Sequence, residues 1–233
     1  MTNILQKKPK ISFLNFLIIN RNISYQNLSR KTILLFKDIL FKIKAPNFNT
    51  KKALLLGHGR SGTDIVINLF QRDLKFEALD EESKVMHNFQ LDFELYNSYA
   101  EASSADVFIA KSVHNPFQVN DFISDSQNKV IWMYRNYKDQ VNSRINQSGY
   151  EYSNFIKDYI LYNKKDTWYS ENIPDKIGHI IKKHDYSNFS DTDWLGLLWW
   201  SVHYTIIHYG LCNNKNFTII SYESLAEKPE FHL

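Results

Sequence analysis

The sequence has a single cysteine, Cys212, among its 233 residues. One thiol cannot form an internal disulfide, and it excludes a zinc site built from several thiolates. A reducing compartment is the default for such a chain, so we predict a cytoplasmic protein.

Long apolar runs are also lacking. The segment 11–19, ISFLNFLII, is interrupted by Asn15 and falls well below the roughly 20 apolar residues that a membrane span needs. It follows three lysines, but no small-residue cleavage site comes after it, which argues against a signal peptide. The apolar segment 194–210 contains His203 and His208 and is more typical of a buried helix. We therefore expect a soluble protein.

The net charge is only +3, but it is unevenly distributed along the chain. Residues 1–50 carry nine Lys and Arg against one acid, Asp38, whereas the rest of the chain carries 19 basic and 24 acidic residues. A basic segment of this kind suits contact with an anionic membrane surface, although we favour a solvated extension, helical over 31–44. We predict no nucleic-acid partner. The chain then divides into a basic extension, 1–50, and one domain, 51–233.

From residue 51 the pattern alternates between strands and helices. Short apolar runs predict strands over 53–57, 76–80, 106–113, 129–136 and 216–225, and helical patterns predict helices over 64–74, 87–102 and 138–147. Such alternation predicts an α/β fold with a mostly parallel sheet flanked by helices. The segment 149–192 lacks a clean period, and we expect it to form helices and loops over the carboxyl edge of the sheet, where such folds bind ligands.

The loop LLLGHGRSGTDIV, residues 54–66, lacks the lysine of an ATP-binding P-loop. Gly57 and Gly62 have the P-loop spacing, but Thr63 and Asp64 occupy the positions of the lysine and of the metal-binding hydroxyl. The cationic residue is Arg60, inside the loop. These losses argue against a P-loop kinase or NTPase with its obligatory metal. Backbone amides at a helix start still suit a terminal phosphate; the alternative is a tight strand–helix turn without a ligand.

A second segment, VIWMYRNYKDQVNSRI, offers an independent anion site. Arg135 ends a predicted strand, and Ser143 lies about two turns along the following helix. An arginine and a serine placed in this way can converge on one phosphate. The alternative is an ordinary surface arginine and a helical serine.

Together these segments resemble the sulfotransferase family, whose donor is 3′-phosphoadenosine-5′-phosphosulfate (PAPS). The resemblance rests on GHGRSGT as the 5′-phosphosulfate loop, on YRNYKDQVNS as the 3′-phosphate motif, and on FTIISYESLAEKP as the family's last strand, ending in Tyr-Glu-x-Leu. It implies a P-loop-like sandwich, a sulfuryl transfer to a hydroxyl, and no required metal. The implied donor-binding residues are Gly57, Gly59, Arg60, Ser61, Gly62, Thr63, Arg135 and Ser143.

Sulfuryl transfer needs a cation near the bridging oxygen and a base for the acceptor hydroxyl. Arg60 suits the first role, and DVFIAKSVHNP adds Lys111 and His114 as further catalytic candidates, with His114 as the base implied by the family's Lys-Ser/Thr-His segment. A carboxylate of Asp80–Glu82 is the rival base, as in carbohydrate-modifying branches of the family. The alternative interpretation of Asp80–Glu82 is a solvent-exposed helix start with Asp80 as N-cap.

The acceptor is predicted from aromatic residues between the 3′ motif and the last strand. Interleaved with polar residues, they suit stacking on sugar rings, so we favour a carbohydrate or glycolipid hydroxyl over a small phenol; they are Tyr150, Tyr152, Phe155, Tyr159, Tyr162, Trp168 and Tyr169. Trp194, Trp199 and Trp200 fit a core helix better.

Three departures from the family leave a further alternative open. His114 follows Lys-Ser-Val, one residue later than in the family's Lys-Ser/Thr-His segment. Asp64 stands where the family usually has a second threonine, and a carboxylate there would repel a bound phosphate. The chain ends at EKPEFHL, where the family normally continues, so we expect an incomplete C-terminus. The alternative is a catalytically silent nucleotide-binding protein on the same fold.

Overall fold

The computed structural model describes residues 30–47, 49–87 and 90–228. Its centre is a five-stranded sheet in the order β2-β5-β1-β6-β7, in which every neighbouring pair is parallel. The strands are β1 (Lys51–Gly57), β2 (Phe76–Leu79), β5 (Val107–Lys111), β6 (Lys129–Tyr134) and β7 (Phe217–Ser221). This confirms the predicted α/β fold with a parallel sheet. A short antiparallel pair, β3 (Met86–His87) with β4 (Gln90–Leu91), lies outside this sheet.

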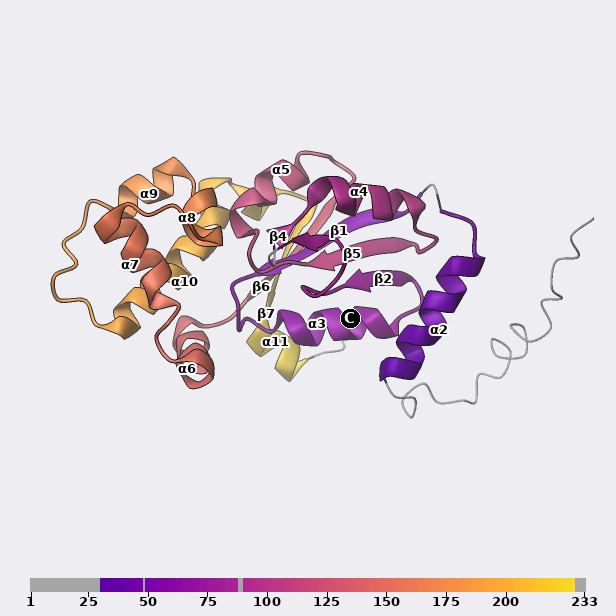
Figure 1. The fold of residues 1–233 in the computed structure, drawn as a ribbon, viewed down its shortest axis with the longest axis horizontal. Helices are drawn as coiled ribbons and strands as arrows, with labels where there is room; N and C mark the ends of the chain where they lie inside the picture. The colour runs from indigo at the N-terminus through magenta and orange to yellow at the C-terminus, as the bar shows by residue number, and fades with distance from the viewer. Residues whose placement is uncertain (1–29, 48, 88–89, 229–233) are drawn as a thin grey trace, which may run out of the picture.

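Helices cover both faces of the sheet because its strands are apolar on both sides. Along β1, Leu54 and Leu56 join one buried cluster, whereas Ala53 and Leu55 join the other. The helices α3 (Thr63–Arg72) and α11 (Tyr222–Glu227) pack on one face, and α4 (Phe93–Ala102), α5 (Val119–Ile123) and α10 (Asp191–His208) supply the cluster on the other (Figure 1). Central strands buried on both faces are typical of parallel sheets.

A group of helices stands beyond one end of the sheet. It contains α6 (Tyr137–Ser148), α7 (Ser153–Tyr162), α8 (Trp168–Asn172) and α9 (Asp175–Ile181), which gather beside α10 (Figure 1). Single turns of 3₁₀ helix occur at η2 (Pro116–Gln118) and η3 (Leu211–Asn213). Trp194 is buried in the core from α10, as expected, and Trp199 and Trp200 are half-buried.

The helix predicted over 31–44 is present as α2 (Arg30–Ile43), and it packs against α3. The Lys37 ammonium is buried and donates hydrogen bonds to the carbonyls of Phe70, Gln71 and Asp73 at 3.3, 3.0 and 2.6 Å. These carbonyls end α3, where a helix has acceptors without intrahelical partners. Burial lowers the pKa of Lys37 to about 8. Segment 11–19 lies outside the described residues, and the domain boundary near residue 50 stays a prediction.

Three expectations about local structure are wrong, each because a side chain binds the backbone. The strand predicted over 216–225 ends at Ser221, whose hydroxyl accepts from the Ser224 amide and starts α11. The helix predicted over 87–102 begins only at Phe93, since the Asp92 carboxylate accepts from the Leu95 amide as N-cap. Asp80 starts a turn and not a helix, because its carboxylate accepts from the Glu82 amide. In the described ranges, no helix is long and apolar enough to span a bilayer.

Candidate active site

The loop between β1 and α3 requires glycine at position 62. Gly62 has φ 98°, a left-handed conformation, and a Cβ there would lie 2.5 Å from Cδ2 of Tyr222. A Cβ on Gly59 would lie 2.1 Å from Nη2 of Arg144. Arg60 between them also has a left-handed backbone, with φ 74°, and its side chain is exposed. The loop thus places the amino end of α3, with its orphan amides, and an exposed guanidinium at the same sheet edge.

His58 and Gln140 connect this loop to α6. His58 is buried, and the Gln140 amide nitrogen donates to its ring Nδ1 at 2.6 Å and to the Gly59 carbonyl at 2.8 Å. Burial, followed by the charge of Arg144, lowers the pKa of His58 well below its ordinary 6.5. The imidazole is therefore neutral, and it serves as a fixed acceptor between α6 and the loop.

Helix α6 brings the second predicted motif against the same loop. Asn136 caps the helix by accepting from the Lys138 amide. Nη1 of Arg135 donates to the Arg60 carbonyl at 3.2 Å, and Nε of Arg60 donates to the Ser143 hydroxyl at 3.1 Å. These three residues line a cavity of about 420 Å³, together with Asp139, Asn142, Asn146 and Gln147. The two segments that carried separate sequence signals therefore form one site.

A second cavity of about 400 Å³ adjoins the first, and Arg60 and Gln147 line both. One side is polar and comes from the loop and the strand ends, with Thr63, Lys111 and His114. The other is aromatic, with Tyr152, Phe155 and Trp168. Ring centroids lie 5.1 Å apart for Tyr152 and Phe155, 6.1 Å for Phe155 and Trp168, and 5.0 Å for Trp168 and His114.

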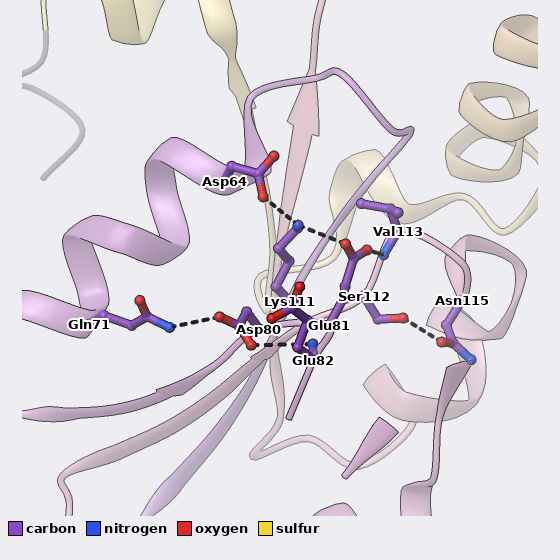
Figure 2. A network of polar contacts seen from close by, with 9 residues as sticks. All are labelled: Asp64, Gln71, Asp80, Glu81, Glu82, Lys111, Ser112, Val113 and Asn115. Atoms are coloured by element: carbon purple, nitrogen blue, oxygen red, sulfur yellow. Dashed lines mark hydrogen bonds and ion pairs between the residues drawn. The ribbon is translucent and has the colours of Figure 1, made fainter. Parts of the chain in front are cut away.

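Lys111 lies in an ion-pair network at the floor of this second cavity. Figure 2 shows its ammonium between two carboxylates, Asp64 at 2.6 Å and Glu81 at 2.9 Å. The other Glu81 oxygen accepts from the Val113 amide at 3.2 Å. Burial alone would lower the pKa of Lys111, but the two carboxylates outweigh it and raise that pKa. Asp64, which the sequence suggests would repel a phosphate, is thus paired with a cation.

Three predicted donor-binding residues, Gly57, Ser61 and Gly62, line neither cavity. The Ser61 side chain is completely buried, and its hydroxyl would lie 2.7 Å from a Cβ placed on Gly57. Its amide donates to the His58 carbonyl at 3.0 Å and closes the loop turn. In this conformation Ser61 and Gly57 shape the loop, and any contact of Ser61 with a ligand stays a prediction.

Arg144 is a site residue that sequence reasoning missed, as are Asn142, Asn146 and Gln147. It follows Ser143 on α6, is 7% exposed, and lines the second cavity with its guanidinium carbon 4.0 Å from the Tyr152 ring centroid. Gln140, Ser143 and Arg144 are spaced i, i+3 and i+4, so they share one helix face. That spacing was the available signal, because Ser143 was already assigned to the site.

Comparison with known proteins agrees with this geometry. The family model described as the sulfotransferase domain matches residues 50–233, which is more than half of the chain. No curated protein matches the sequence. The sulfotransferase family model implies PAPS as donor and a sulfuryl transfer to a small-molecule acceptor. With its parallel sheet and a loop without the P-loop lysine, this chain belongs to the sulfotransferase family.

Proposed function

We propose that the chain binds PAPS across the two adjoining cavities and transfers its sulfuryl group to a carbohydrate or glycolipid hydroxyl. The observation that carries this proposal is the contact of the two motifs through Arg60. Because Arg60 lines both cavities and bonds to Arg135 and Ser143, one ligand can span both cavities. The loop would hold the 5′ side, with Arg60 and Thr63, and Arg135 with Ser143 would hold the 3′-phosphate.

The charge of the site fits a donor with several negative groups. Within the described part of the chain, Arg60, Arg135 and Arg144 form no ion pair with a carboxylate. The Nε atoms of Arg135 and Arg144 are buried and have no hydrogen-bond partner among the described residues. Of the three, Arg144 is buried, and buried charges are normally paired, so its guanidinium, without an ion-paired carboxylate and beside two further arginines, favours an anionic ligand.

His114 is the base that we propose for the acceptor hydroxyl. It lines the second cavity beside the aromatic wall, where an acceptor can reach it. The rival base, Glu81, lines the same cavity, but each of its oxygens already accepts a hydrogen bond, from Lys111 and from Val113. When bound, PAPS supplies the activated sulfuryl group. His114 takes the acceptor proton, and Arg60 stabilises charge that develops on the leaving phosphate.

The aromatic wall supports a sugar as acceptor. Of the seven predicted aromatic residues, Tyr152, Phe155 and Trp168 line the cavity, whereas Tyr159 and Tyr169 are buried in the core. Rings with polar neighbours at a half-open cavity suit the apolar faces of sugar rings. The cytoplasmic location and the membrane contact of residues 1–50 stay predictions from composition and charge.

The test is a thermal-shift comparison of adenosine 3′,5′-bisphosphate with AMP, ADP and ATP–Mg²⁺. We expect the bisphosphate to stabilise the protein most. Arg135→Ala should weaken bisphosphate binding about 10- to 100-fold, the value of one or two charged hydrogen bonds, and should leave AMP binding unchanged. Arg72→Ala is the matched control, since Arg72 is an exposed arginine outside both cavities.

A preference for ATP–Mg²⁺, or an unchanged bisphosphate affinity in Arg135→Ala, would refute the proposal. Transfer of labelled sulfate from PAPS to a panel of glycans then tests catalysis. Bisphosphate binding without transfer to any glycan or phenol would indicate the silent nucleotide-binding protein. Transfer to phenols alone would refute the sugar acceptor.

A further inference from the structure

Arg144 is a buried cation at the cavity that forms no ion pair with a described carboxylate. Its side chain leaves α6 and lies against the phosphate loop, so closely that a Cβ on Gly59 would require the guanidinium to move. The guanidinium also packs on the Tyr152 ring, which belongs to the aromatic wall. It therefore lies where the loop and the aromatic wall meet, the two sides that we assign to donor and acceptor.

Lys111 provides the contrast. Both are buried cations of the same cavity, but Lys111 is held by Asp64 and Glu81 at 2.6 and 2.9 Å. Two carboxylates offset its charge, and the ammonium is directed toward them (Figure 2). Burial lowers the pKa of Arg144, yet a guanidinium remains protonated at neutral pH. Arg144 thus lacks the close carboxylate partners that hold Lys111, and Glu81 acts on its charge only from a longer distance.

We propose that Arg144, and not Lys111, is the second cation beside Arg60 that stabilises the transferring sulfuryl group. This inference rests on the proposed function. In the reaction, the acceptor oxygen forms a bond to sulfur while the bond from sulfur to the 5′-phosphate oxygen breaks. The bonding electron pair stays with the phosphate, and the acceptor proton passes to the base. Negative charge on the sulfuryl and phosphate oxygens is then stabilised by guanidinium N–H donors fixed in advance.

Contacts within the chain hold Arg144 at this cavity. Gln140, one turn earlier on α6, anchors the helix to the loop through the His58 ring and the Gly59 carbonyl. The Tyr152 ring supports the guanidinium from the other side. Donors that are fixed in this way need no reorganisation during the reaction, which is the condition for strong transition-state stabilisation.

The test compares Arg144→Met and Arg144→Lys with wild type. Lys138→Met is the matched control, because Lys138 is an exposed cation on the same helix. Two quantities are measured: the thermal shift caused by adenosine 3′,5′-bisphosphate, which lacks the sulfuryl group, and kcat and KM for sulfate transfer from PAPS. We expect Arg144→Met to keep the bisphosphate shift and to lose about 100-fold in kcat, the usual effect of removing one such donor. Arg144→Lys should recover part of kcat because it keeps a charge.

Several results would overturn the inference. Wild-type kcat in Arg144→Met would do so, as would a bisphosphate shift lost in proportion to kcat, which would make Arg144 a phosphate ligand. A raised KM for the acceptor at unchanged kcat would assign Arg144 to the acceptor. If Arg144→Met does not fold, Arg144→Lys decides, with reduced kcat at an unchanged shift as support and wild-type kcat as refutation. Failure of wild type itself to bind the bisphosphate would instead refute the proposed function.

Discussion

Two buried histidines make the stability of this protein depend on pH below 6.5, the ordinary pKa of an imidazole. His203 on α10 is 8% exposed, and the Trp132 ring N–H donates to its Nδ1 at 3.0 Å. Its proton is therefore on Nε2, and a second proton on Nδ1 would face the Trp132 donor. Burial lowers the pKa of His203 to about 3. His58 is held in the same way by Gln140, with its pKa lowered by burial.

The sign follows from proton binding in the two states. Between pH 6.5 and the lowered pKa, the unfolded chain binds a proton at each of these histidines, and the folded chain does not. The free energy of unfolding therefore falls as the pH falls. For His203 the loss between pH 6.5 and pH 5.0 is about 1.6 kcal/mol, from 1.36 kcal/mol per pKa unit. His58 adds a loss of similar size as long as the pH stays above its own lowered pKa.

The assay is urea denaturation at several pH values between 7.5 and 5.0. His203→Asn should remove the loss of about 1.6 kcal/mol in unfolding free energy that His203 causes between pH 6.5 and pH 5.0. An asparagine oxygen can still accept from Trp132, but it does not titrate in this range. His184→Asn, which removes an exposed histidine, is the matched control and should behave as wild type. If His203→Asn retained the wild-type slope, the assignment of a neutral, buried His203 would be wrong.

Two further predictions concern the network of Lys111, Asp64 and Glu81. Lys111→Met should lower the free energy of unfolding by about 2 kcal/mol, mainly because it leaves the half-buried Glu81 without its cation. Chemical denaturation measures this loss and its recovery in the double variant Lys111→Met with Glu81→Gln. If the double variant recovered no stability, the unpaired Glu81 would not be the cause. Asp64→Asn should tighten adenosine 3′,5′-bisphosphate binding by about 2- to 5-fold. The gain is modest because the Asp64 side chain is 72% exposed and its charge is screened. Titration calorimetry should show a smaller gain at high salt, and weaker binding of the variant would instead make Asp64 a positioning residue for the donor.

The sequence by itself determined the features that depend on local spacing. Apolar runs with turn residues between them located the five parallel strands. The runs are most continuous in the central strands, since a strand buried on both faces needs a continuous apolar run. Gly57 and Gly62 located the loop, and Arg135 with Ser143 located the second motif, each within one strand–helix unit. Segment boundaries at Asp92 and Ser221 were missed because a single capping side chain outweighs the pattern around it.

Only the tertiary structure decided which distant side chains meet. Lys111 ends β5, Glu81 lies in the turn after β2, and Asp64 lies in the first turn of α3 after β1. They form one network because β2, β5 and β1 are neighbours in the sheet. The same packing buries Ser61, whose hydroxyl was predicted to bind the donor, and directs Arg144 toward the loop. Sequence spacing fixes which face of one element a residue occupies, but the order of strands fixes what that face meets.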